Sequence, residues 1–97
     1  MKYHVKVDKN QPEIVKELRK KGCAVLHTHQ LKNAFDILVG YRKKLYLVEI
    51  KTDHSKKLTS GEQKCKELFA TVGVDYLVIT TADEFFNNIT NGKEIYR

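Results

Sequence analysis

The spacing of apolar and polar residues along the chain predicts helices that alternate with short strands. Apolar positions that recur every three or four residues favour helices at 8–22, 60–73 and 82–90. Short apolar runs typical of strands occupy 23–29, 34–41, 44–51 and 75–80, and an alternating stretch at 3–7 is compatible with one more. The order αβββαβα predicts a single α/β domain spanning 1–97, with helices packed on a mixed central β-sheet.

Local signals set the expected ends of the two longer helices. Asn10 is a favourable N-cap, and Glu13 follows it by three residues, as in a capping box. Gly22 is a natural stop for this helix. We expect Ser60 to cap the second long helix and Gly73 to end it.

The tight basic turn between 34–41 and 44–51 predicts an antiparallel hairpin. If the chain turns at Arg42 and Lys43, residues 41 and 44 pair, and Asp36 faces Glu49 directly across the two strands. An even slip in register leaves the two acids diagonal neighbours on one face, and an odd slip puts them on opposite faces. The register stays open at this point, because Arg-Lys is a poor type I′ turn and Gly40 permits other geometries.

Asp36 and Glu49 are acids within otherwise apolar runs, and Lys51 shares a strand face with Glu49. Two neighbouring carboxylates repel each other, and burying one unpaired is costly. A divalent cation relieves both problems, because Mg²⁺ takes carboxylates together with water and the phosphate oxygens of a substrate. The main-chain carbonyl of Ile50 is a further candidate ligand. Lys51 is suited to position or deprotonate a water, or to neutralise charge on a phosphate. The alternative is a surface strand whose charged side chains simply face water.

Positive charge is concentrated in two segments of a chain whose net charge is +6. Residues 1–22 hold seven basic and three acidic side chains, and residues 42–57 hold six and two. Such clusters favour a polyanionic partner, most simply a nucleic acid, although a solvated surface gives the same pattern. The expected phosphate contacts are Lys43, Lys44, Lys56, Lys57 and Lys64.

Composition narrows the class of protein further. No apolar run approaches the roughly 20 residues that a membrane span requires, and the N-terminus has no apolar signal-peptide core. Cys23 and Cys65 lack C-x-x-C spacing, so we expect reduced thiols in a cytosolic protein. His27 and His29 alternate and share a strand face, which suits Zn²⁺, a phosphate or plain surface. Tyr41, at the basic turn, is a candidate for stacking on a base, or an ordinary aromatic residue at the hairpin end.

Four groups of residues around the acids follow one another along the chain. They are Phe35-Asp36, Gly40, the run LYLVEIK that ends in Glu49-Ile50-Lys51, and KLTSGEQ. In this order the chain resembles the PD-(D/E)xK nuclease superfamily and, within it, the VRR-NUC branch of virus-type replication and repair nucleases. The resemblance extends from about Asn10 to Ile79. Phe35 departs from the family pattern, which has proline there, but that position carries no chemistry.

The resemblance implies a restriction-endonuclease-like core (αβββαβ) and endonuclease activity on DNA that depends on Mg²⁺ or Mn²⁺. The similar family members are small stand-alone domains from phages and prophages. They resemble Holliday junction resolvases in their fold and in forming dimers. We therefore expect a cytoplasmic homodimer in a bacterial host, acting on branched DNA such as a four-way junction.

The resemblance also implies roles for individual residues. Asp36 and Glu49 would be metal ligands, and Lys51 the catalytic lysine. Glu13 matches the further acid that the first helix of the family often supplies, although the capping box explains it equally well. Gln63 matches a polar residue of the family that touches the scissile phosphate or orders a water. The alternative is that Gln63 is an ordinary exposed helix residue.

Two other functions stay open. The chain could be a nucleic-acid-binding module without catalysis, although binding alone does not need the two acids and Lys51. It could also be a metal-dependent nuclease that acts on flaps, nicked duplex or RNA.

Overall fold

The computed structural model describes residues 9–93, with side chains as far as Ile89. The elements are α1 (Gln11–Lys20), β1 (Ala24–His27), β2 (Ile37–Tyr41), β3 (Lys44–Ile50), α2 (Ser60–Ala70), β4 (Asp75–Ile79) and α3 (Ala82–Lys93). The predicted α/β class and the order αβββαβα are confirmed. The strand expected at 3–7 lies outside the described residues.

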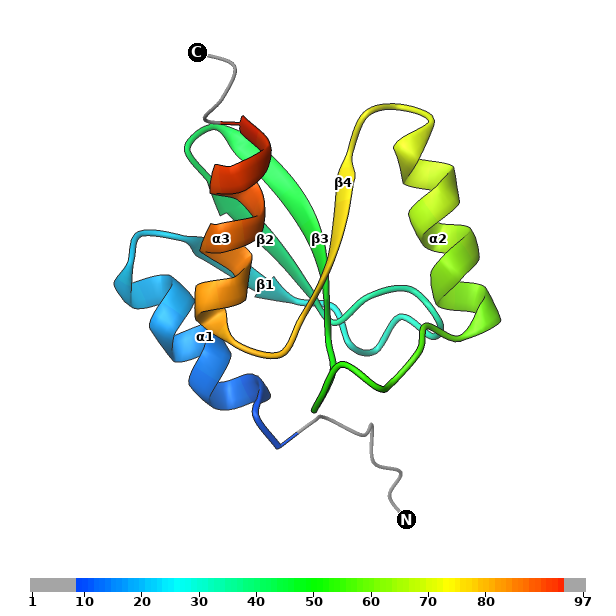
Figure 1. Ribbon diagram of the computed structural model, residues 1–97, viewed down its shortest axis with the longest axis horizontal. Helices are drawn as coiled ribbons and strands as arrows, with labels where there is room; N and C mark the ends of the chain where they lie inside the picture. Colours follow the sequence, from blue (N-terminus) through cyan, green and yellow to red (C-terminus); the bar gives the residue numbers. More distant parts are fainter. Residues whose placement is uncertain (1–8, 94–97) are drawn as a thin grey trace.

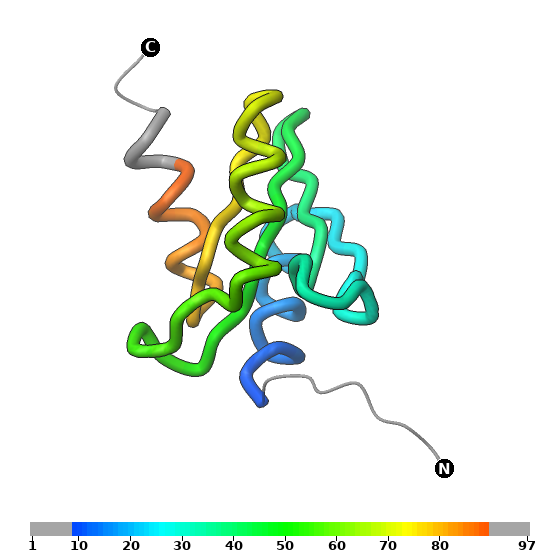
Figure 2. The backbone as a smooth tube through the Cα atoms, turned by 90° about the vertical axis from the view of Figure 1, so that its right-hand side faces the viewer, coloured from blue at the N-terminus to red at the C-terminus, as the bar shows by residue number. Residues whose placement is uncertain are grey.

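The four strands form one mixed sheet in the order β1-β2-β3-β4. The pairs β1/β2 and β2/β3 are antiparallel, and β3/β4 is parallel. Helices α1 and α3 contact each other on one face, and α2 packs beside β4 on the other (Figure 1). Figure 2, viewed from the side of α2, shows this helix in front of the strands. The sheet is therefore flanked by helices on both faces, as expected.

The main hydrophobic core lies between the sheet and the pair α1 and α3. Alternation along the strands turns Ile37, Val48 and Ile50 to this face, where they are fully buried. Leu18 of α1 and Phe85 of α3 cover them and are also fully buried. The opposite face, under α2, holds a smaller set of buried residues outside this core.

The N-terminus of α1 differs from the expectation. The side chain of Asn10 makes no capping hydrogen bond, so the predicted capping box with Glu13 is wrong. The Asn10 amide instead donates to the carbonyls of Lys51 and Thr80, at 3.1 Å each. It thereby ties the ends of β3 and β4 together. A local cap would use the Asn10 side-chain oxygen as an acceptor. The tertiary fold instead orients the side chain so that its NH2 group donates, and the oxygen is buried without a partner in the described residues.

The other helix ends follow glycine and capping rules. At the end of α1, Gly22 has φ of 95°, and the N–H of Cys23 donates to the carbonyl of Leu18, as in a Schellman motif. Gly73, with φ of 78°, closes the turn after α2 in the same way. The cap of α2 is Thr59, so the predicted cap at Ser60 is wrong by one residue.

Two expectations from composition concern the described residues. Cys23 and Cys65 are both free thiols. None of the helices in residues 9–93 is long and apolar enough to cross a lipid bilayer.

Candidate active site

Of the registers that the sequence left open, the hairpin with the two acids has the one expected for a turn at Arg42 and Lys43. Tyr41 pairs with Lys44, and the turn residues Arg42 and Lys43 have φ values of 51° and 68°. Two consecutive positive φ values are typical of a type I′ turn, whose twist matches that of a two-residue hairpin. The turn therefore forms even though neither residue is glycine or asparagine.

Asp36 lies just before this ladder and is anchored to it. Its N–H donates to the carbonyl of Val48 at 3.0 Å, although Val48 pairs with Ile37, so the pairing is irregular here. The Asp36 carboxylate accepts from the backbone N–H of Ile50 at 2.7 Å. The side chain thus reaches toward the end of β3, and Asp36 does not form the regular ladder pair with Glu49 that a continued register predicts. Irregular pairing at strand ends re-aims side chains in this way.

Glu49 is the buried acid of the described residues, with 5% of its surface exposed. It lies near the end of β3, on the face that α2 covers. Burial, followed by the negative charges of Asp36 and Glu62, raises the pKa of Glu49 from 4.5 to about 8. Without a cation, these surroundings therefore favour the protonated form of Glu49, which shares a hydrogen bond with Glu62.

Lys51 lies between the carboxyl groups of Glu49 and Glu62. Its ammonium nitrogen is 3.2 Å from Glu49 Oε2 and 3.1 Å from Glu62 Oε1. Burial acts to lower the pKa of Lys51, but the hydrogen bonds to Glu62 and Glu49 raise it above its ordinary value. Lys51 is therefore a cation in this arrangement. A cation suits the predicted roles in positioning and charge neutralisation, and it does not suit the role of a base.

Glu62 is the member of this cluster that the sequence analysis missed. It forms a capping box with Thr59, whose backbone N–H donates to Glu62 Oε1 at 2.9 Å. The same oxygen accepts from Lys51. Burial acts to raise the pKa of Glu62, but hydrogen bonds to Thr59, Lys51 and Glu49 lower it below its ordinary value. The T-x-x-E spacing is a usable signal for the cap, but the contact with Lys51 depends on how α2 docks.

An open cavity of about 440 Å³ is lined by the four ionisable side chains described above, those of Asp36, Glu49, Lys51 and Glu62. Its walls are the loops 28–36 and 51–59, which lie on either side of the first turn of α2 in Figure 2. The Tyr76 hydroxyl donates to the Ala34 carbonyl and ties the first loop to β4. Gly61 approaches the same loop so closely that a Cβ there would lie 2.3 Å from Asn33 Cβ. These contacts fix the position of the loop that forms one wall of the cavity.

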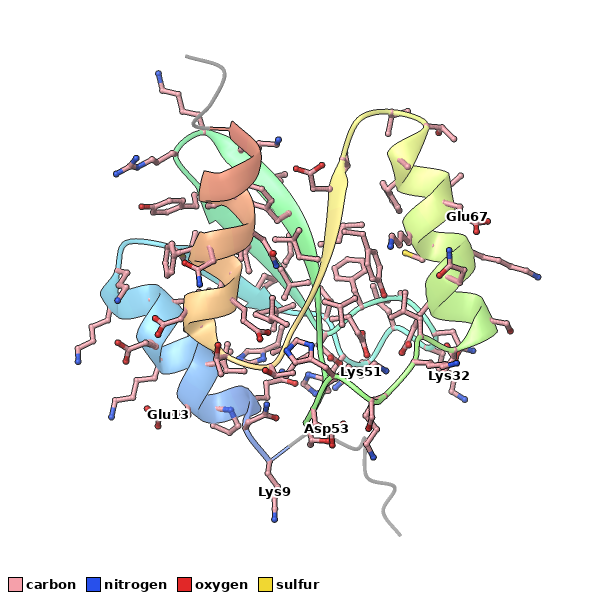
Figure 3. All side chains as sticks on the ribbon, viewed as in Figure 1. Lys9, Glu13, Lys32, Lys51, Asp53 and Glu67 are labelled. Atoms are coloured by element: carbon pink, nitrogen blue, oxygen red, sulfur yellow. The ribbon has the colours of Figure 1, made fainter. Side chains whose placement is uncertain are left out.

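The structure keeps Glu13 and Gln63 away from the two acids. Glu13 is exposed and lines a different cavity, between α1 and the start of α3. In Figure 3 it lies on the outer side of α1, away from Lys51. Gln63 is exposed, and its amide donates to Glu67 at 2.9 Å. Neither residue lines the cavity that contains Asp36 and Glu49.

The predicted phosphate contacts divide into two groups. Lys56 and Lys57 line the cavity, whereas Lys64 is exposed on α2 and does not. Lys43 and Lys44 lie at the opposite end of β3, where Lys44 forms an ion pair of 3.1 Å with Asp75. Five residues of strand, at about 3.3 Å each, put Lys44 roughly 17 Å from Glu49. Any contact of these two lysines with DNA would therefore be far from the acids.

Tyr41, at the same hairpin, packs its ring against Phe86 at 5.3 Å between centroids. This arrangement supports the structural alternative, an aromatic residue at the end of a hairpin.

The oxygen donors fit a small, hard cation. No three His, Cys, Asp or Glu side chains within residues 9–93 gather around one point that would hold a metal, and His27 and His29 approach each other without a third ligand. Asp36 lies near enough to Glu49 that, after burial, its negative charge is the next cause that raises the pKa of Glu49. Mg²⁺ commonly binds through one or two carboxylates, with waters and phosphate oxygens in the other positions. Ile50 lines the same cavity, so its carbonyl stays a candidate ligand.

Comparison of the chain with protein-family models, curated proteins and solved structures finds no match. The resemblance to the VRR-NUC branch therefore stays a prediction from the motif residues.

Proposed function

We propose that this protein is a metal-dependent endonuclease that hydrolyses phosphodiester bonds in DNA, on a restriction-endonuclease-like core of the PD-(D/E)xK type. The supporting observation is that Asp36, Glu49 and Lys51 meet in one open cavity at the end of the hairpin. A binding module does not need two carboxylates that repel each other beside a half-buried lysine. Hydrolysis of a phosphodiester uses both.

The residues of the cavity have complementary tasks. Mg²⁺ or Mn²⁺ held by Asp36 and Glu49 would polarise the phosphate and lower the pKa of an attacking water. Lys51, as a cation, stabilises the charge that develops on the phosphate oxygens. Lys56 and Lys57 on the wall attract the neighbouring phosphates of the strand. The water oxygen forms a bond to phosphorus and releases a proton to solvent. The bond to the 3′ oxygen breaks and that oxygen takes a proton from water, so the products carry 5′-phosphate and 3′-hydroxyl ends.

We propose branched DNA, with the four-way junction first, as the substrate, and a homodimer as the active form. A four-way junction has approximate two-fold symmetry, which suits two cuts by a C2 dimer. Leu26 and Leu45 supply apolar surface for a dimer, since they are 61% and 57% exposed on the sheet face that carries α2.

The test is cleavage of a labelled four-way junction and a matched linear duplex in Mg²⁺, Mn²⁺ or EDTA. We expect cutting that requires the metal and prefers the junction. Asp36→Asn and Lys51→Ala should each lower the rate by about a hundredfold or more while DNA binding persists. Lys66→Ala is the matched control, because Lys66 is exposed on α2 outside the cavity.

Cleavage that survives Asp36→Asn, or that proceeds equally in EDTA, would refute the proposed site. Tight, salt-sensitive binding without cleavage of any substrate would instead identify a binding module.

A further inference from the structure

A second cavity, of about 580 Å³, lies between α1 and the end of β1. We call it the α1 groove. Its main lining residues are Pro12, Val15, Lys16, Arg19, His27 and His29. His29 also lines the cavity of Asp36 and Glu49, so the two cavities are neighbours. A strand bound in one would pass His29 to reach the other.

Charge on α1 is segregated around the helix. Lys16 and Arg19 line the α1 groove, whereas Glu13 and Glu17 line the cavity on the other side. Within the described residues, no carboxylate side chain lines the groove. A polyanion there would therefore be attracted without facing a local negative charge.

The walls of the groove suit a flat, partly apolar ligand. Pro12 is exposed and apolar, and the buried Val15 also lines the groove. The rings of His27 and His29 meet edge to face, with 5.8 Å between their centroids. The amide of Gln11 contacts His27 Nδ1 at 3.3 Å and helps to fix that ring. Gln11 Oε1 and His29 Nδ1 are buried without a hydrogen-bond partner in the described part of the chain. A nucleobase combines a flat face, which stacks on such rings, with polar atoms at its rim.

We propose that the α1 groove binds an unpaired nucleotide of the DNA strand that leaves the active site past His29. This inference rests on the proposed function and narrows its substrate. Lys16 and Arg19 contact the phosphates, and the imidazole of His27 stacks on the base. A base in a duplex is stacked and paired and cannot enter the groove. Within branched DNA, the inference therefore favours substrates with an unpaired strand at the branch point over the fully paired four-way junction.

The test compares three labelled DNAs in EDTA, where no cleavage occurs, by fluorescence anisotropy. The first is a branched DNA with a short unpaired strand, the second is identical but abasic at its first unpaired positions, and the third is a paired duplex of the same length. We expect the wild type to bind the first roughly 5- to 100-fold more tightly than the second, as expected for base stacking on an aromatic ring. His27→Ala should bring this ratio close to one, and His27→Phe should restore it.

The charge of the groove is tested separately. Lys16→Glu should weaken binding of the unpaired strand about tenfold, through loss of a phosphate contact. Lys20→Glu changes the same charge on an exposed residue of α1 outside the groove, and it should weaken binding less than about twofold. Thermal melting and circular dichroism of each variant check that it is folded.

Equal binding of the base-bearing and abasic strands by the wild type would overturn the inference, and so would equal effects of Lys16→Glu and Lys20→Glu. If the wild type still cleaves branched DNA in those cases, the proposed function stands and only the groove fails. If the wild type binds no DNA of any kind, both fail together.

Discussion

Replacement of Glu49 by glutamine should remove a large part of the pH dependence of the protein's stability when no divalent cation is present. The pKa of Glu49 is raised from 4.5 to about 8 in the folded protein, mainly by burial and then by Asp36 and Glu62. The folded state therefore binds this proton more tightly than the unfolded chain does. The resulting stabilisation is fully present below pH 4.5 and is lost as the pH rises through about 8.

The size of the effect follows from the same shift. Each pKa unit corresponds to about 1.4 kcal/mol, so a shift of this size sets an upper limit of about 5 kcal/mol. Glu49 is only 5% exposed, so solvent screens little of this energy. The lowered pKa of Glu62 makes stability fall as the pH drops, but only below its ordinary pKa of 4.5. That pH lies below the range tested here. We expect the wild type to lose about 2 to 5 kcal/mol between about pH 5 and about pH 9 relative to Glu49→Gln.

The assay is urea unfolding of both proteins in EDTA, followed by circular dichroism across this pH range. Other titrating groups are common to both proteins and cancel in the difference. Glutamine resembles the protonated acid, so Glu49→Gln should match the wild type near pH 5 and exceed its stability near pH 9. Added Mg²⁺ should stabilise the wild type at high pH, by binding to the folded state, and affect Glu49→Gln much less. Parallel stability curves for the two proteins would refute the reasoning about this carboxyl group.

Three further predictions concern the surroundings of the site. Lys51 lies 3.2 Å from Glu49 and 3.1 Å from Glu62. Without the Glu62 carboxylate, Lys51 would interact with Glu49 alone and compete there with a metal ion. Glu62→Gln should therefore weaken Mn²⁺ binding severalfold, measured by calorimetry. The same change in a Lys51→Ala background should have no effect, and an equal loss there would make Glu62 a ligand instead. Gly61→Ala should destabilise the fold by about 1 to 3 kcal/mol in urea unfolding, since its Cβ would lie 2.3 Å from that of Asn33, and wild-type stability would show that the loop yields freely. Asn10→Ala should lower the unfolding free energy by about 1 to 3 kcal/mol, because two carbonyls at the ends of β3 and β4 lose their donor, and an unchanged midpoint would show that water replaces it.

The sequence alone predicted the parts of this protein that short-range rules govern. The order of helices and strands follows from apolar periodicity, and Gly22 and Gly73 end their helices as expected. The sequence left the hairpin register open, and the observed register is the one expected for a turn at Arg42 and Lys43. Alternation along β3 then puts Glu49 and Lys51 on one face.

Only the tertiary structure decided which distant segments complete the cavity. Lys51 gains Glu62 as a partner because α2 docks with its first turn against the end of β3. Asn10 makes no local cap because its side chain is oriented to donate to carbonyls at the ends of two strands. Glu13, in contrast, lines a cavity elsewhere. Spacing in the sequence fixes contacts within one element or one tight turn, whereas contacts between elements depend on the packing of side chains from the whole core.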